Sequence, residues 1–225
     1  MSDNTLIEAT DLHKTYHVGK VEVPALRGVN VTVEKGEFLA IVGPSGSGKT
    51  TLLNLIGALD VPTRGELTVF GRDIAAMSKR ARADMRLHSL GFVFQAYNLV
   101  PVLTARENVE FVLELQGVGP ERKDRAVEVL QHLGLGDLAD RRPNELSGGQ
   151  QQRVAVARAV ASRPDLVLAD EPTANLDGEN ARILLEMMRG LNEESEITFL
   201  FSTHDQRVVD HARRVVRLID GRVEL

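Results

Sequence analysis

The residues best suited to chemistry in this sequence lie at positions 43–50, which read Gly-Pro-Ser-Gly-Ser-Gly-Lys-Thr. Their spacing fits G-x-x-x-x-G-K-[ST], the pattern of a phosphate-binding loop. An apolar run from Phe38 to Val42 precedes the loop, and Thr51 to Leu59 follows it with helical spacing of apolar residues. A strand that turns into a helix through glycines presents backbone N–H groups to an anion. The sequence therefore predicts a site for a nucleoside triphosphate.

The side chains of this loop are expected to bind different parts of such a ligand. The ammonium of Lys49 reaches the β- and γ-phosphates as a point charge, the Thr50 hydroxyl binds Mg²⁺, and Thr51 touches a phosphate oxygen. The alternative is a glycine- and serine-rich turn that binds nothing, and the flanking strand and helix argue against it. We expect ATP and Mg²⁺ as cofactors. The predicted ATP-binding residues of the loop are Gly43, Pro44, Ser45, Gly46, Ser47, Gly48, Lys49, Thr50 and Thr51.

Composition limits the class of protein. The chain has 225 residues, 43% of them hydrophobic, a net charge of −5 and no cysteine. This is enough for the core of one domain, the charge does not favour broad nucleic-acid binding, and disulfides and thiolate metal sites are excluded. The chain has no apolar run of about 18 residues, the length needed to cross a membrane, and its start, Met-Ser-Asp-Asn-Thr, lacks the features of a secretion signal. We expect a protein that is soluble on its own and for which another chain supplies any membrane part.

The pattern of apolar residues predicts an α/β fold. Residues 166–169 and 197–201 are apolar at nearly every position, which indicates parallel strands buried on both faces. Residues 29–33 alternate apolar and polar, as in an antiparallel strand with one face in solvent. Further strands are predicted at 6–9, 66–70, 91–94, 213–218 and 222–225, and helices at 75–87, 104–115, 121–133, 147–161 and 178–191, with a helical block near 97–160 that interrupts the sheet.

Polar residues follow several of the buried strands, and ligands bind at the carboxyl ends of parallel strands. Asp170 is the natural partner of Thr50 for Mg²⁺. Glu171 is placed to act as general base on an attacking water. Gln95 and His204 each follow a strand, and His204 could hold the γ-phosphate or orient the water. In isolation either residue is more often structural, so both gain weight only from their position.

A second anion cradle is predicted where Leu146-Ser147-Gly148-Gly149-Gln150 precedes a helix. Ser147 can cap the helix, and the two glycines leave the backbone N–H groups bare. By itself this is also the pattern of an ordinary capped helix.

Together these motifs resemble those of ATP-binding cassette (ABC) transporter ATPases over essentially the whole chain. His204 is similar to the switch histidine of the family, Gln95 to its Q-loop glutamine and Tyr16 to the aromatic residue that stacks on adenine. Gly43–Thr50 resembles the Walker A loop, Leu146–Gln150 the family signature, Leu166–Asp170 with Glu171 Walker B and its catalytic glutamate, and Asn175–Asp177 the D-loop.

The resemblance implies an architecture and a partner. The fold would be a P-loop NTPase (RecA-like) core with a mostly parallel sheet, an antiparallel β subdomain at the N-terminal side and an inserted α-helical subdomain. The single nucleotide-binding domain, 1–225, would divide into a core at about 1–95 and 162–225 and a helical part at about 96–161. Two copies would form a head-to-tail homodimer in which Ser147, Gly148, Gly149 and Gln150 act on the ATP of the partner. Asp177 would act at the same interface, and the metal ligands would be Thr50, Gln95 and Asp170.

A narrower resemblance is to the subgroup of macrolide-exporter, lipoprotein-release and cell-division ATPases. Residues 23–29, 58–60, 91–95 and 98–99 carry it. It implies a motor ATPase coupled to a separate integral membrane permease at the cytoplasmic face of a bacterial inner membrane, with no direct contact to nucleic acid. The alternatives are a cell-division-type scaffold that controls a periplasmic partner, and a soluble ABC ATPase that acts on nucleic acid or ribosomes. The basic residues between Lys79 and Arg86 form either a solvated helix face or a surface near lipid headgroups.

Overall fold

A computed structural model describes residues 4–224 of the chain. The strands are β1 (Thr5–Val18), β2 (Val21–Glu34), β3 (Phe38–Val42), β4 (Arg64–Val69), β5 (Arg72–Asp73), β6 (Leu90–Val93), β7 (Leu166–Asp170), β8 (Thr198–Thr203), β9 (Arg214–Ile219) and β10 (Arg222–Glu224). The helices are α1 (Lys49–Ile56), α2 (Lys79–Ser89), α3 (Ala105–Leu115), α4 (Arg122–His132), α5 (Gly148–Ala161), α6 (Gly178–Ser195) and α7 (Gln206–His211), with short 3₁₀ turns η1 (Gly136–Leu138) and η2 (Pro143–Glu145). The last strand predicted from the sequence ends at Leu225, which lies outside the described residues.

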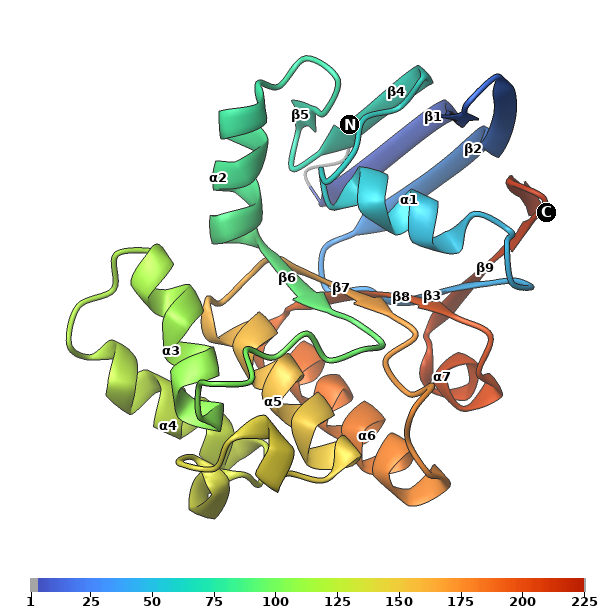
Figure 1. Ribbon diagram of the computed structural model, residues 1–225. Coiled ribbons are helices and arrows are strands. Elements are labelled where there is room, and N and C mark those ends of the chain that lie inside the picture. The colour runs from blue at the N-terminus through green and yellow to red at the C-terminus, as the bar shows by residue number, and fades with distance from the viewer. Residues whose placement is uncertain (1–3, 225) are drawn as a thin grey trace.

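Two sheets form the framework (Figure 1). The larger has the order β10-β9-β3-β8-β7-β6, and all its neighbours are parallel except β10 and β9. The smaller has the order β2-β1-β4-β5 and is antiparallel throughout. The predicted fold class, a mostly parallel sheet with an antiparallel β unit on its N-terminal side, is therefore confirmed.

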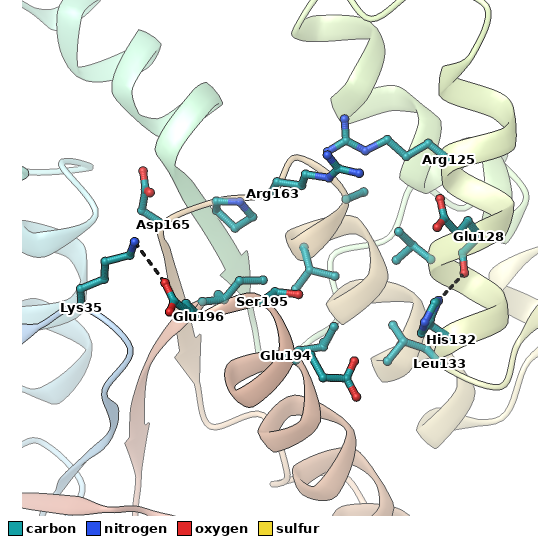
Figure 2. A pocket seen from close by; sticks show the side chains of 16 residues that line it. Lys35, Arg125, Glu128, His132, Leu133, Arg163, Asp165, Glu194, Ser195 and Glu196 are labelled. Carbon is teal, nitrogen blue, oxygen red and sulfur yellow. Dashed lines mark hydrogen bonds and ion pairs between the residues drawn. The ribbon is translucent and has the colours of Figure 1, made fainter.

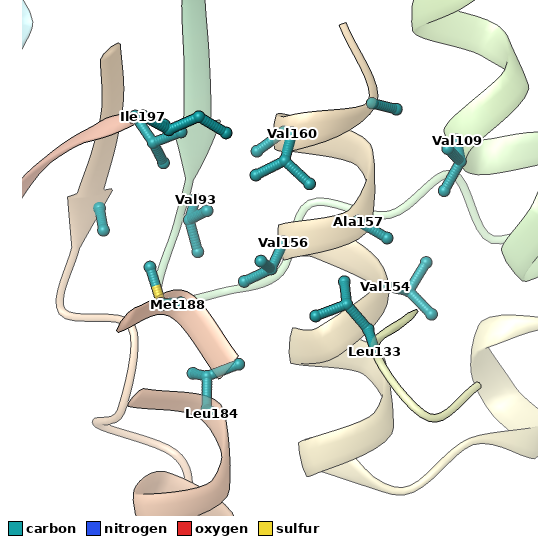
Figure 3. Close-up of a cluster of buried hydrophobic side chains, with 14 of the residues drawn as sticks. Val93, Val109, Leu133, Val154, Val156, Ala157, Val160, Leu184, Met188 and Ile197 are labelled. Carbon is teal, nitrogen blue, oxygen red and sulfur yellow. The ribbon is translucent and has the colours of Figure 1, made fainter. Parts of the chain in front are cut away.

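The larger sheet is buried on both faces, which is why its strands are apolar at nearly every position. In β3, Phe38 and Ala40 face one apolar cluster, while Leu39 and Ile41 face the other. The first cluster lies between the sheet and helices α3 to α6, as Figure 3 shows around Val156. The second lies between the sheet, helix α1 and the antiparallel strands.

Aromatic packing fixes the centre of the first cluster. The rings of Phe38 and Phe201 lie 4.6 Å apart between centroids, and Phe199 lies 5.6 Å from Phe38. All three are buried. Their strands, β3 and β8, carry the phosphate loop and His204 at their carboxyl ends, so this packing sets the spacing of those two segments.

Helices α3, α4 and α5 lie between β6 and β7 in the sequence, and they pack on one another (Figure 1). The chain therefore leaves the sheet after Val93 and returns to it at Leu166. This confirms that a helical block interrupts the sheet where the sequence predicted it. Within residues 4–224, no helix combines the length and the apolar character that crossing a bilayer demands.

The main differences from the predicted elements have local causes. The helix predicted from Ala75 begins at Lys79, because the Ser78 hydroxyl caps its first turn and accepts a hydrogen bond from the backbone N–H of Ala81. Strands β1 and β2 extend to a hairpin around Gly19 that the sequence did not predict, since polar residues break the alternation there. Helix α7 has six residues, too few to show a period.

Candidate functional site

The phosphate loop joins β3 to α1, as predicted. Gly46 and Gly48 have φ values of +80° and +102°, a region that strongly favours glycine. A Cβ atom on Gly43 would lie 2.0 Å from the carbonyl oxygen of Leu218, which leaves no room for a side chain. The three glycines are thus required by the path of the backbone, and this path gives the loop its cradle shape.

Lys49 lies across the mouth of this cradle. Its Nζ donates hydrogen bonds to the carbonyl oxygens of Gly43 at 2.8 Å and Pro44 at 3.0 Å. The residue is buried, with 7% of its surface exposed. A desolvated ammonium in a glycine-rich cradle at a helix N-terminus is suited to bind an oligophosphate.

Thr50, in the first turn of α1, contacts Asp170, the last residue of β7. The Thr50 hydroxyl donates to Asp170 Oδ2 at 3.0 Å and lies 3.3 Å from Oδ1. Hard oxygen ligands of this kind fit Mg²⁺, which binds through one or two protein oxygens, phosphates and water. Within residues 4–224, no group of three or more histidine, cysteine, aspartate or glutamate side chains could hold a metal ion.

Glu171 and His204 meet although 33 positions separate them in the sequence. Nδ1 of His204 lies 2.7 Å from Oε1 of Glu171, and the Thr203 hydroxyl donates to Oε2 at 3.2 Å. Glu171 adopts φ = +48°, in the left-handed region, and its side chain contacts His204 while that of Asp170 contacts Thr50. The Glu171 side chain is 15% exposed and that of His204 70% exposed. The carboxylate is therefore held from two sides, whereas the imidazole has this one hydrogen-bond partner among residues 4–224.

Lys49, Thr50, Glu171 and His204 share one cavity of 370 Å³, and Asp170 lies outside its lining. It is lined by Ala25, Ser45, Gly46, Gly48, Lys49, Thr50, Thr51, Gln95, Glu171 and His204. The structure thus brings together the phosphate loop, Gln95 two positions beyond β6, and Glu171 and His204 directly after β7 and β8. This is the convergence at the carboxyl ends of parallel strands that the sequence predicted.

The second anion cradle lies outside this cavity, since residues 147–150 are not among its lining. Ser147 caps α5: its Oγ accepts from the backbone N–H of Gln150 at 3.3 Å, and the Gln150 side chain accepts from the N–H of Ser147 at 2.8 Å. A Cβ on Gly149 would lie 2.6 Å from Oδ1 of Asn180 in α6, so a side chain here would require that of Asn180 to move.

Two other predicted residues have structural partners in this chain. Asp177 caps α6 and accepts from the backbone N–H of Asn180 at 2.9 Å; this bond is the main reason that its pKa is lowered. Tyr16 lies on β1 outside the lining of the cavity, and the Lys14 ammonium lies 5.1 Å from the centre of its ring. The roles predicted for both residues remain predictions.

Two contacts that support the site were not predicted, and Asn175 of the predicted D-loop makes one of them. Gln152 in α5 is fully buried, and its Nε2 donates to the carbonyl oxygen of Pro172 at 2.8 Å, directly after Glu171. Asn175 donates to the backbone carbonyl of Gln95 at 3.0 Å. The only signal in the sequence was a polar residue, Gln152, within the buried face of α5, and its partner is set by tertiary structure alone.

Two other hollows contain no predicted catalytic residue. A cavity of 320 Å³ opens at the amino ends of β7 and β8, between α4 and the ends of α5 and α6 (Figure 2). It is lined by charged residues such as Lys35, Arg125 and Glu196, but it lies at the wrong end of the sheet for a ligand site of this fold. An apolar groove of 430 Å³ between α2, β6, α3 and α5 includes Leu59, Leu87, Phe92, Val112 and Leu115.

The fold and the phosphate loop define a P-loop nucleoside triphosphatase. Residues 26–174 match the family model described as ABC transporter. The chain therefore belongs to the ABC transporter family, whose ATP-binding members are ATPases, and the resemblance seen in the sequence is confirmed.

Curated relatives agree over nearly the whole chain. A Thermotoga maritima protein named as an uncharacterized ABC transporter ATP-binding protein is 50% identical over 97% of this chain and 94% of its own length. The lipoprotein-releasing system ATP-binding protein LolD of Anaeromyxobacter dehalogenans is 48% identical over 96% of this chain and 92% of its own. The macrolide export ATP-binding/permease protein MacB of Syntrophobacter fumaroxidans is 46% identical over 97% of this chain, which spans 31% of that longer protein.

Solved structures show the same fold. The dimeric ATP-binding cassette MJ0796, in a post-hydrolysis state bound to ADP and Pi, superimposes with a TM-score of 0.91 at 42% identity, covering 98% of this chain and 97% of that one. CbiO1 of Clostridium perfringens, part of the ABC transporter complex cbiONQ, gives a TM-score of 0.88 at 28% identity, covering 99% and 88%.

Proposed function

We propose that this chain hydrolyses Mg-ATP in the phosphate-loop cavity and that a second copy of the chain completes the site. The observation that carries the proposal is the presence of Lys49, Glu171 and His204 in one cavity at the carboxyl ends of neighbouring strands. A cation for the phosphates and a carboxylate for the attacking water are the two groups that ATP hydrolysis most needs.

Binding begins at the loop. Lys49 exchanges the carbonyl oxygens of Gly43 and Pro44 for phosphate oxygens, which offer full negative charge to the same ammonium. Thr50 and Asp170 hold Mg²⁺, with Gln95 as a further ligand. When bound, the ion neutralises charge that develops on the phosphates.

Hydrolysis needs a base next to the terminal phosphate. Glu171 accepts a proton from water while Oε1 and Oε2 keep hydrogen bonds from His204 and Thr203, which hold the carboxylate in one orientation. The exposed side of the His204 imidazole faces the same cavity and is available to the γ-phosphate.

The glycine-flanked Ser147 explains why two copies are needed. Its cradle, residues 147–150, stands outside the cavity of its own chain but has the helix N-terminus that an anion favours. In a head-to-tail homodimer it would meet the γ-phosphate bound to the partner. Asp177, which caps the next helix, would lie at the same interface.

We further propose that the dimer drives a separate integral membrane permease and works at the cytoplasmic face of a bacterial inner membrane. The apolar groove near Leu115, continued by the exposed Phe111, offers a surface for such a partner. The names of two relatives, MacB and LolD, support macrolide export or lipoprotein release as the process that this chain serves, and the permease would determine what is moved.

Mixing two inactive variants tests the shared site. Lys49→Met removes the cation that binds phosphate. Ser147→Asp keeps a good helix cap but places a carboxylate where the partner's γ-phosphate would lie. In a mixed dimer one composite site pairs an intact phosphate loop with an intact Ser147, so we expect measurable ATPase activity from the mixture when neither variant alone has any.

A matched control is Ser78→Asp, because Ser78 caps α2 through the same kind of bond. This variant should retain full activity. If the mixture stays as inactive as its components, each ATP is served by one chain only and the two-copy proposal is wrong.

A further inference from the structure

The loops that carry Glu171 and His204 are joined just beyond these two residues. Thr173 lies two positions after Glu171, and Asp205 lies one position after His204. The Thr173 hydroxyl donates to Asp205 Oδ2 at 2.6 Å. Thr173 is fully buried and the Asp205 side chain is only 15% exposed. A charge-assisted hydrogen bond in this setting is strong and leaves little freedom to either loop.

Asp205 is held by further donors. The backbone N–H and Nε of Arg207 both donate to its Oδ1 at 2.9 Å, and Nη2 of Arg207 donates to Oδ2 at 2.7 Å. Burial alone would raise the pKa of Asp205, but the hydrogen bonds from Arg207 and Thr173 outweigh it and lower the pKa to about 2. The carboxylate is thus ionised and fixed at neutral pH.

A second path leads from Asp205 back to the base. Its backbone N–H donates to the Thr203 hydroxyl at 2.9 Å, and that hydroxyl donates to Oε2 of Glu171 at 3.2 Å. The Thr173–Asp205 bond and this second path through Thr203 both link the loop of Glu171 to the loop of His204. They matter because Glu171 has φ = +48°, a conformation that is unfavourable in a non-glycine residue and persists only where its surroundings enforce it.

Arg207 extends the network to the start of α6. The hydrogen bond to Asp205 is the main cause of the raised pKa of Arg207, and the negative charge of Asp177 raises this pKa further. A Cβ on Gly178 would lie 3.9 Å from Nη1 of Arg207. The segment predicted to act at the dimer interface is therefore next to the same guanidinium.

We propose that Thr173 and Asp205 are positioning residues that lock the loop of Glu171 to the loop of His204, so that base and imidazole keep one geometry toward the cavity. The inference rests on the proposed function of Glu171 and His204. Neither residue lines the cavity, so neither would touch ATP. Their effect should appear in the rate of the chemical step and not in nucleotide affinity.

Thr173→Val tests this, because valine keeps the shape but has no hydroxyl. We expect kcat for ATP hydrolysis to fall about tenfold or more, since small misplacements of catalytic groups are costly, while KM for ATP changes less than about twofold, as expected for an interaction that serves the transition state alone. Thr173→Ser restores the hydroxyl and should recover most of the rate.

Thr198→Val is the matched control. Thr198 is also fully buried in the chain, and its hydroxyl accepts from the backbone N–H of Gly36 at 2.9 Å, but at the opposite end of β8. It should lose thermal stability comparably and keep kcat. Asp205→Asn, which keeps a helix cap but weakens the ionic contact with Arg207, serves as a second variant if Thr173→Val does not fold.

The outcomes separate the two proposals. Unchanged kcat in Thr173→Val or Asp205→Asn, or an equal loss in Thr198→Val, would overturn the positioning role. Absence of ATP hydrolysis by the wild-type chain, or full activity of Glu171→Gln, would instead contradict the proposed function itself.

Discussion

At the scale of single residues, adjacent acids have separate partners. Asp170 ends β7 and contacts Thr50, while Glu171 turns through a positive φ and contacts His204. In the proposed mechanism, Asp170 would hold the metal ion and Glu171 would act on the attacking water. Two chemically similar side chains that are adjacent in the sequence would then have different tasks.

Glu171→Gln tests the task of the second acid. Glutamine keeps the size and one acceptor oxygen but cannot accept the proton of water, so we expect kcat to fall by about 10²–10⁴ with ATP binding preserved. Steady-state phosphate release and nucleotide titration measure the two effects. Glu186→Gln, which breaks an exposed ion pair with Arg182 of 2.7 Å, is the control and should retain the wild-type rate.

The low pKa of Asp205 predicts a pH-dependent stability. Because its pKa is about 2 in the folded chain and 3.8 is the usual value, the ionised form stabilises the fold at pH above about 4, and this contribution is lost as the pH falls toward 2. Urea unfolding should show a difference of about 2 kcal/mol between the wild type and Asp205→Asn at pH 7.

That difference should shrink when the same unfolding curves are recorded at successively lower pH below 4. A difference that stays constant over this range would show that Asp205 does not have the lowered pKa.

At the scale of elements, hydroxyl and carboxylate caps decide where the helices of the site begin. Ser147 begins α5, Asp177 begins α6 and Thr104 begins α3. Two of these residues also belong to motifs with a predicted role in the dimer. The structural role of a cap and the functional role of a motif are therefore carried by the same side chain, and variants must keep the cap to isolate the function.

Thr104 lies away from the site, so the contribution of a capping hydrogen bond to the free energy of unfolding can be measured there. Its hydroxyl accepts a hydrogen bond from the backbone N–H of Glu107, and the Glu107 carboxylate accepts one from the backbone N–H of Thr104. Thr104→Ala should lower the free energy of unfolding by about 1 kcal/mol, measured by urea titration. Thr104→Ser keeps the hydroxyl and should lose much less, and equal losses for both variants would rule out the capping bond as the cause.

At the scale of the whole molecule, the phosphate loop and the predicted second cradle at residues 147–150 lie in different places of one chain, and this supports the proposed assembly of two copies. If ATP holds the copies together, the Glu171→Gln variant should form a species of twice 24.7 kDa with Mg-ATP and remain a single copy with Mg-ADP. Sedimentation or light scattering measures this. Glu171→Gln combined with Ser147→Asp should stay a single copy, and a stable pair in that double variant would place the contact elsewhere.

The features that could be predicted from the sequence are those that depend on residues close together in the chain. The phosphate loop, the buried parallel strands and the cap at Ser147 depend on neighbours in the chain, and all three are found where the sequence placed them. The hairpin at Gly19 and helix α7 were missed, because the first breaks the alternation of apolar residues and the second is shorter than two helical turns.

By itself the sequence determined the chemistry available to this protein: a glycine-rich loop with Lys49, hard oxygen ligands, a glutamate and a histidine at strand ends. Tertiary structure alone decided which of these groups meet, since the contact of Glu171 with His204 and that of Thr173 with Asp205 each join segments more than thirty residues apart. The physical reason is that neighbouring parallel strands bring their carboxyl ends together whatever the length of chain between them, and no local pattern records the hydrogen bonds that then form across the gap.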